Sequence, residues 1–204
     1  MTSITLHHGD LPADLSFGSA VAVDTETLGL VPVRDRLCLV QLSAGDNSAH
    51  LVQFKQGAYN APNLKKLLTD NSVEKIFHFA RFDLAVLKTY LGVECAPIFC
   101  TKIASKLCRT YTDRHGLKDI CRELIEISLS KEQQSSDWGT QELSAAQKTY
   151  AASDVVYLHE LREKLELMLL REKRLDLAQA CFRFLPHRVA LDLSGWPNID
   201  IFEH

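Results

Sequence analysis

This chain has no excess of basic residues: 23 lysines and arginines stand against 26 aspartates and glutamates, a formal net charge of −3. Proteins that grip long polyanions usually carry a basic surface, because the release of counterions supplies much of their affinity. The balance therefore argues against a long nucleic acid as partner. A short anionic ligand held in a local pocket agrees better with it.

Paired cysteines and membrane segments are also missing. The six cysteines form no Cys-x-x-Cys pair and no Cys/His cluster with the spacing of a zinc site. No apolar run approaches the ~20 residues of a membrane span, and the N-terminal residues lack the pattern of a signal peptide. We therefore expect a cytoplasmic protein with reduced thiols that is not bound to a membrane.

The rest of the composition, 204 residues of which 46% are hydrophobic and 24% charged, is typical of one globular domain. We predict a single α/β domain over residues 1–204, with a mixed five-stranded sheet flanked by helices. Three strands form an antiparallel meander, and two follow through crossovers. The predicted strands are residues 20–23, 36–43, 49–54, 73–79 and 96–99, and the predicted helices are residues 63–68, 83–91, 101–108, 116–129 and 144 to about 180.

Two segments fall outside this pattern. Residues 131–144 are polar and are expected to form an ordered loop. Residues 185–204 are predicted to be an extended C-terminal arm, in which prolines interrupt a set of apolar side chains. The arm either packs on its own domain or buries those side chains against another subunit.

Acidic residues in three segments are candidates for a metal site. Asp24 and Glu26 are two apart after an apolar run, so on a strand their side chains share one face. Asp83 lies where a strand leads into a helix, and Tyr150 and Asp154 are four apart, which places them on one helix face. Four carboxylates at one point repel each other, and hard cations such as Mg²⁺ or Mn²⁺ turn that repulsion into binding.

Each segment taken alone also has a simpler explanation. Asp24 and Glu26 match solvated acids at a strand end. Asp83 matches an ordinary acid at a helix N-terminus, and Tyr150 with Asp154 matches a buried tyrosine beside a solvated acid. Their combination favours a site in which two cations ~3.5–4 Å apart clamp a phosphate. The four carboxylates would be the metal ligands, and the tyrosine would orient the attacking water and help to remove its proton.

At these residues the chain resembles the DEDD superfamily of 3′–5′ exonucleases, in the branch with a tyrosine in the last motif. Its relatives there are ribonuclease D-like proteins with an RNase H-like core. The resemblance covers roughly residues 20–165, including HGLKDIC at 115–121 and SSDWGTQELSAAQKTYAASDVVYL at 135–158. It implies a metal-dependent 3′–5′ exoribonuclease that produces 5′-mononucleotides.

Two features depart from ribonuclease D. We expect none of the helical RNA-binding domains of that protein in these 204 residues, and residues 27–37 look like the corresponding turn of oligoribonuclease. The whole chain, with TKIASKL and TYTDRHGLK, is similar to the stand-alone nanoRNase C group of alphaproteobacteria. This resemblance implies cleavage of RNA dinucleotides and very short oligoribonucleotides, and a ring-shaped homo-octamer.

The resemblance also implies substrate contacts. Leu30 would be an apolar wedge between two bases, and its alternative is a turn residue folded into the core. Lys102 or Arg114 would bind a 5′ phosphate, and Tyr111 or Phe82 would stack on a base. The full set of candidates is Thr25, Leu30, His78, Arg81, Phe82, Lys102, Tyr111, Arg114 and His115.

Several of these candidates have structural alternatives. Phe82 would also suit the core, and Arg81 would suit an ion pair with Asp83 or a surface acid. His115 is a poor candidate for the catalytic base, because Tyr150 fills that place. Trp138 is expected to pack its own loop.

Two other functions stay open at this point. One is a broader exonuclease that trims structured RNA or single-stranded DNA. The other is a non-catalytic nucleic-acid-binding module, which would require the loss of an acidic residue, whereas all four are present with the tyrosine.

Overall fold

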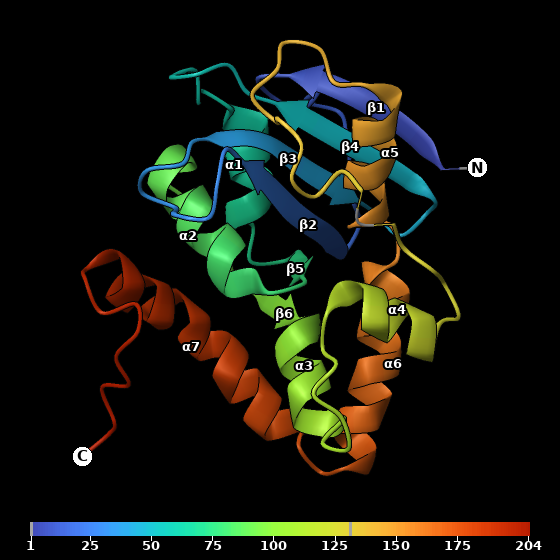
Figure 1. Ribbon diagram of the computed structural model, residues 1–204, viewed down its shortest axis with the longest axis vertical. Helices are drawn as coiled ribbons and strands as arrows, with labels where there is room; N and C mark the ends of the chain where they lie inside the picture. Colours follow the sequence, from blue (N-terminus) through green and yellow to red (C-terminus); the bar gives the residue numbers. More distant parts are fainter. Residues whose placement is uncertain (1, 131) are drawn as a thin grey trace.

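The strands of the computed structural model, which describes residues 2–130 and 132–204, form one sheet (Figure 1). They are β1 (Ser3–His8), β2 (Ala20–Thr27), β3 (Leu37–Ser43), β4 (Ser48–Gln53), β5 (Glu74–Phe77) and β6 (Ile98–Cys100). The sheet order is β1-β4-β3-β2-β5-β6. β2, β3 and β4 are an antiparallel meander, whereas β1 runs parallel to β4, β5 parallel to β2, and β6 parallel to β5.

The predicted α/β class and mixed sheet are confirmed, but the predicted number of five strands is wrong. The sixth strand, β1, lies at the edge of the sheet and pairs with β4 from Ser3↔Ser48 to His8↔Gln53. The sequence gives no clear signal for β1, because Ile4 and Leu6 are its only apolar residues and they form no continuous apolar run.

Seven helices surround the sheet in the described residues. They are α1 (Pro62–Thr69), α2 (Ala80–Leu91), α3 (Thr101–Cys108), α4 (Leu117–Leu124), α5 (Ala145–Ser153), α6 (Leu158–Arg171) and α7 (Leu175–Leu193). In Figure 1, α5 lies in front of the sheet and α1 behind it, α3 and α6 extend below β6, α4 lies to the right of β6, and α7 runs along the lower left. None of the helices in this part of the chain is long and apolar enough to cross a membrane.

The C-terminal half differs from the prediction in several bounds. The helical region expected from residue 144 to about 180 is divided into α5, α6 and α7, and the helix expected over 116–129 ends at Leu124. The loop expected over 131–144 begins with Lys131, which lies outside the described residues.

The C-terminal arm does not begin at residue 185, as predicted, because α7 continues to Leu193 with Pro186 inside it. Three apolar side chains of α7, Phe182, Leu185 and Val189, are buried on one helix face. Burial of this face offsets the backbone hydrogen bond that the proline removes. The non-helical C-terminal segment is therefore residues 194–204.

Candidate active site

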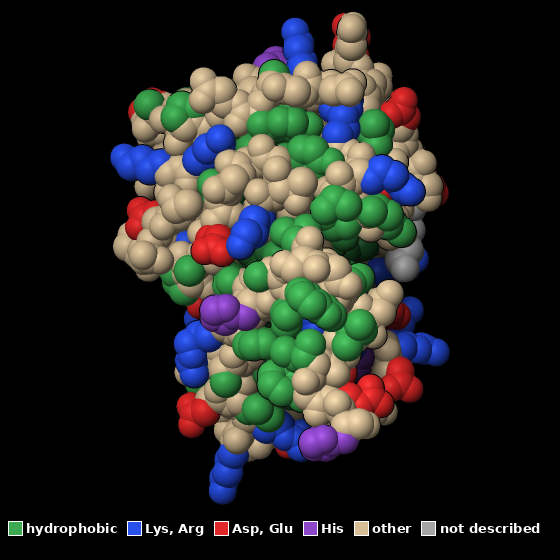
Figure 2. Space-filling view, turned by 90° about the vertical axis from the view of Figure 1, so that its left-hand side faces the viewer, with side chains coloured by type: hydrophobic (Ala, Val, Ile, Leu, Met, Phe, Trp, Pro, Cys, Tyr) green, Lys and Arg blue, Asp and Glu red, His purple; other side chains and the backbone are tan. Residues whose placement is uncertain are grey.

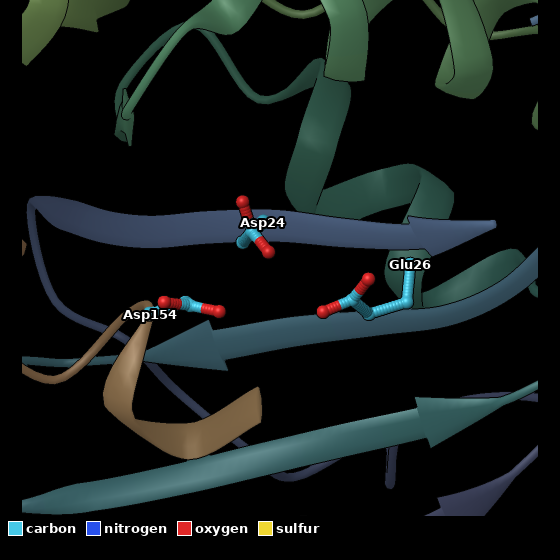
Figure 3. A group of neighbouring side chains, drawn as sticks. All are labelled: Asp24, Glu26 and Asp154. Atoms are coloured by element: carbon cyan, nitrogen blue, oxygen red, sulfur yellow. The ribbon is translucent and has the colours of Figure 1, made fainter. Parts of the chain in front are cut away.

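Three carboxylates meet beside β2. Asp24 and Glu26 are on β2, and Asp154 is the residue directly after α5. Their side chains are directed into one space in Figure 3. One carboxylate oxygen from each residue lies within 4.8 Å of the others. Oxygen atoms at this spacing suit a hard divalent cation.

Two local features of α5 determine the position of Asp154. Ser144 and Gln147 form a capping box, in which the Ser144 hydroxyl accepts the Gln147 N–H at 3.2 Å and the Gln147 side chain accepts the Ser144 N–H at 2.9 Å. Ala151 and Ala152 are buried, and their small side chains let α5 approach the sheet closely. The capped start of α5 and its close packing on the sheet together bring Asp154 next to Asp24 and Glu26.

Asp83 is not one of these three residues, although its charge acts on them. It lies in the first turn of α2, only 4% exposed, and the Thr25 hydroxyl donates a 2.7 Å hydrogen bond to its Oδ1. Its charge contributes to raising the pKa of Asp24. The structure thus places Asp83 beside the cluster and holds it there through Thr25.

In the protein without metal ions, the pKa values of all four carboxyl groups are raised. Burial raises the pKa of Asp24 well above its ordinary value, and the other three carboxylates add to the effect. Burial also raises the pKa of Glu26 to about 9, and it raises the pKa values of Asp83 and Asp154 to about 7. Because a nearby cation favours the charged carboxylates, this donor set fits divalent metal ions.

Tyr150 stands one helical turn before Asp154 and is half-buried. Burial, followed by the charge of Asp154, raises the pKa of its hydroxyl, so the phenol is protonated at neutral pH. Its ring centroid is 6.0 Å from that of Trp138, which is 2% exposed. Trp138 is packed in a small buried cluster with Leu39 of β3, Leu51 of β4 and Leu143 of its own loop. It also lines the cleft described below, which the expectation of loop packing did not include.

Gln41 on β3 is a buried neighbour of the cluster that the sequence analysis overlooked. It lies directly opposite Asp24 in the β2–β3 pairing, which puts both side chains on one face of the sheet. Its side chain is 0% exposed, and neither its Nε2 nor its Oε1 has a hydrogen-bond partner among the described residues. Because a buried amide normally has a hydrogen-bond partner, an ordered water is the simplest group to satisfy Gln41.

The acidic residues line a cleft of about 680 Å³. Five of the predicted substrate contacts also line it, namely Thr25, Leu30, His78, Phe82 and Lys102. Burial lowers the pKa of His78 to about 3, with Lys102 adding to the effect, so this imidazole is neutral.

Four other candidate contacts are not part of the cleft lining. The Tyr111 hydroxyl donates to Glu123 at 2.5 Å, and the backbone carbonyl of Arg114 accepts from Arg109. Arg81 is paired with Asp192 at 2.6 Å, so the ion pair expected for it is present, with an acid from α7. His115 Nδ1 lies 2.9 Å from the Ser105 hydroxyl.

Leu30 is 85% exposed at the cleft, so the alternative that it folds into the core is wrong. Its loop is shaped by Asp35, whose carboxylate accepts the Val31 N–H at 2.9 Å. A Cβ at Gly29 would lie 2.3 Å from Oδ2 of Asp35, so a larger residue there would displace the Asp35 carboxylate that shapes the loop. The loop thus presents Leu30 to the cleft from a defined turn.

Other residues in the cleft lining were missed by the sequence analysis. They include Leu28, Phe79, Leu117, Lys118, Gln134, Ser135 and Ser136. The segment 134–136 had been assigned to a loop without a role. The only sequence signal for Phe79 is its place next to His78, at the turn from β5 to α2.

Comparisons with known proteins agree with this geometry. Residues 9–170 match the profile of the 3′–5′ exonuclease family. The chain belongs to this family. Ribonuclease D of Jannaschia sp. (strain CCS1) is 34% identical over 157 residues, which are 76% of this chain and 40% of that protein. The chain therefore spans about two fifths of the length of this relative.

Solved structures of NrnC from Brucella melitensis match the whole chain. The structure of NrnC bound to pGG is 58% identical, with a TM-score of 0.97 over 100% of both chains. The structure of NrnC with bound Mg²⁺ is 57% identical, with a TM-score of 0.95 over 100% of both chains. The resemblance to ribonuclease D-like exonucleases and to nanoRNase C, and the RNase H-like core, are confirmed.

Proposed function

We propose that this chain is a metal-dependent 3′–5′ exoribonuclease that hydrolyses RNA dinucleotides and very short oligoribonucleotides to 5′-mononucleotides. The observation that carries the proposal is the group of carboxylates of Asp24, Glu26 and Asp154 within 4.8 Å of one another, beside Tyr150 in a cleft of limited size. The structures of Brucella NrnC with pGG and with Mg²⁺ support the substrate class and the metal.

The acidic residues would hold two divalent ions, Mg²⁺ or Mn²⁺. Asp24, Glu26 and Asp154 would bind one ion, and Asp24, with waters held in part by Asp83, would bind the other. When bound, the ions supply positive charge to the reacting phosphate and make water more acidic near neutral pH.

The protein's own part in the reaction is to position water and substrate. Tyr150, as a protonated phenol beside Asp154, would orient the attacking water by hydrogen bonding. The water oxygen bonds to phosphorus while the bond to the O3′ of the preceding nucleotide breaks, and a proton passes to that O3′. The product is a nucleotide with a 5′ phosphate. The raised pKa of the Tyr150 hydroxyl favours positioning of the water over removal of its proton as the part that this residue plays.

Several features support a short substrate. The positive side chains of Lys102 and Lys118 line the cleft, whereas the chain as a whole has a net charge of −3. Local cations suit one or two phosphates better than a long backbone. Leu30, exposed at the same cleft, would separate the two bases.

A length series tests the proposal. 5′-labelled oligoribonucleotides of two to twenty residues are incubated with the native chain in Mg²⁺ and in Mn²⁺, with Asp24→Asn as the inactive control. We expect the rate to fall steeply beyond the shortest substrates. Comparable rates on the dimer and the twenty-mer would favour the broader ribonuclease D-like exonuclease, and the absence of metal-dependent hydrolysis would overturn the enzyme assignment.

We also propose that the chain forms a homo-oligomer, for which the resemblance to nanoRNase C implies an octameric ring. Figure 2 shows hydrophobic side chains gathered over the lower part of the molecule, where α7 and the C-terminal segment lie. Trp196, Ile199, Ile201 and Phe202 are exposed on that segment, and an exposed apolar group of this kind favours burial against another chain. Light scattering that finds a monomer at micromolar concentration would contradict the assembly.

We also propose that the protein is located in the cytoplasm. All six cysteines are free, and five of them are buried, which agrees with a reducing compartment. Fractionation of cells that produce the chain would test the location directly.

A further inference from the structure

Phe79 has a left-handed backbone conformation at the point where β5 leads into α2. Its φ is 69° and its ψ is 44°, and it is the N-cap residue of α2. Glycine and asparagine adopt this conformation at low cost, whereas a bulky side chain is strained there. A phenylalanine at such a position therefore needs an explanation that involves its ring.

The turn changes where this ring lies. Phe77 on β5 is fully buried, and in a continued strand Phe79 would occupy the same face of the sheet. Instead Phe79 is 46% exposed and lines the catalytic cleft together with Phe82. The strained conformation thus removes an aromatic side chain from the core and brings it to the site.

The ammonium group of a lysine lies against one face of the Phe79 ring. Lys102 Nζ lies 4.0 Å from the ring centroid, in a cation–π contact. The lysine also lines the cleft. Phe79 is therefore an exposed aromatic residue of the cleft with a positive charge against its ring.

We propose that Phe79 is a stacking platform for one base of the short RNA, with Lys102 fixing the ring from its other face. The inference rests on the proposed function and adds a substrate-binding residue to it. Every base has a π-face, so the contact would be tolerant of base identity. It would contribute to ground-state binding and leave the chemical step to the carboxylates and Tyr150.

Two substitutions separate the ring from the backbone. Phe79→Asn retains a residue that tolerates the left-handed conformation and removes the ring, whereas Phe79→Trp retains an aromatic surface. On a dinucleotide, we expect Phe79→Asn to raise KM roughly 5- to 150-fold, the range that a lost stacking contact implies, with a smaller change in kcat. Phe79→Trp should stay near the native KM, and the melting temperature of Phe79→Asn should not fall.

A substrate without one base tests the stacking itself. Dinucleotides with an abasic residue at the first or at the second position are compared in the native chain and in Phe79→Asn. At the position whose base stacks, the two proteins should have the same KM, because the contact is already absent. Equal KM values of the two proteins on the intact dinucleotide would overturn the platform.

A binding measurement keeps this test separate from turnover. In the Tyr150→Phe background, which retains all four carboxylates, a dinucleotide carrying 2-aminopurine should lose fluorescence on stacking, and Phe79→Asn should abolish that loss. If the native chain does not hydrolyse dinucleotides but the quenching depends on Phe79, the proposed function fails and the platform stands. Quenching that is equal with and without Phe79, or no binding at all, overturns the platform.

Discussion

The Thr25 hydroxyl donates a 2.7 Å hydrogen bond to Oδ1 of Asp83, and this bond joins β2 to the first turn of α2. Both residues are buried. The bond lowers the pKa of Asp83 against the stronger effect of burial, which raises it to about 7. One hydroxyl therefore keeps a buried carboxylate oriented and closer to its ionised form.

Thr25→Val removes this hydroxyl without changing the shape of the side chain. We expect the free energy of unfolding to fall by about 1.5–3 kcal/mol, the usual contribution of a hydrogen bond to a charged group. The pKa of Asp83 should rise, so the acid limb of the pH–rate profile should move to higher pH. Thr25→Ser, which keeps the hydroxyl, should restore the native profile, and a profile unchanged in Thr25→Val would contradict the role of the bond.

Burial of the carboxylates, with mutual repulsion as a smaller effect, should make the metal-free protein less stable as the pH rises. Folded pKa values of about 7 for Asp83 and Asp154 and about 9 for Glu26 exceed the ordinary values of 3.8 and 4.5. The folded state therefore binds more protons than the unfolded state between about pH 4 and pH 9, and the stability due to these groups is lost across that window.

Thermal unfolding with and without Mg²⁺ measures this effect. Mg²⁺ should raise the melting temperature more at pH 8 than at pH 5, because bound cations favour the ionised carboxylates. In EDTA at pH 8, Asp154→Asn should melt above the native chain although it does not hydrolyse RNA. Asp113→Asn, a change at an exposed acid outside the cluster, is the control and should do neither. Near-normal activity of Asp154→Asn would show that the site is misassigned.

Leu30→Ala tests the apolar wedge. Because Leu30 is exposed, its truncation should leave the melting temperature unchanged. KM for a dinucleotide should rise roughly tenfold, equivalent to ~1.4 kcal/mol of lost binding. Val33→Ala is the matched control, since Val33 is exposed on the same loop but is outside the cleft lining. Equal effects of the two changes would remove the special role of Leu30.

Gln41→Met tests the orphan amide opposite Asp24. Methionine has a similar length and no polar atom, so the protein should be equally or more stable, because an unsatisfied buried polar group costs about 1–3 kcal/mol. If the amide holds water or a hydrated ion beside Asp24, the Mg²⁺ concentration for half-maximal activity should rise roughly 10- to 100-fold. An unchanged Mg²⁺ requirement would show that the amide does not hold water or a hydrated ion beside Asp24.

Asp192 anchors the C-terminal segment. Its carboxylate accepts from Nε and Nη2 of Arg81 and, at 2.9 Å, from Nε of Arg188. Both arginines also donate to backbone carbonyls of residues 196–199. Asp192→Asn should lower the free energy of unfolding by about 1–2 kcal/mol.

The same change should speed hydrogen exchange in residues 194–202 and lower the oligomeric mass found by light scattering. Asp176→Asn, at an exposed position at the other end of α7, should change neither measurement. An unaltered mass in Asp192→Asn would separate the segment from the assembly.

The sequence predicted best what depends on local periodicity. Asp24 and Glu26 share a strand face, and Asp83 lies where a strand turns into a helix, because these relations follow from residue spacing alone. The structure brings Asp24, Glu26 and Asp154 together, while their role as metal ligands stays a prediction.

What the sequence did not predict depends on distant partners. β1 forms because it pairs with the edge of β4. α7 continues through Pro186 because the apolar face of this helix is buried. The place of Phe79 follows from a left-handed dihedral angle, for which no residue pattern gives a signal. The Gln41 amide became visible only when the pairing register placed it opposite Asp24.

The wide separation of the cluster along the chain has a consequence during synthesis. Asp24 and Glu26 leave the ribosome early, and at 5–20 residues per second Asp154 follows roughly 6–26 s later. Throughout that interval the nascent chain lacks α5 and with it Tyr150 and the third carboxylate. Until Asp154 has emerged, a nascent chain therefore has no complete carboxylate cluster, so the proposed activity begins only after most of the domain has been made.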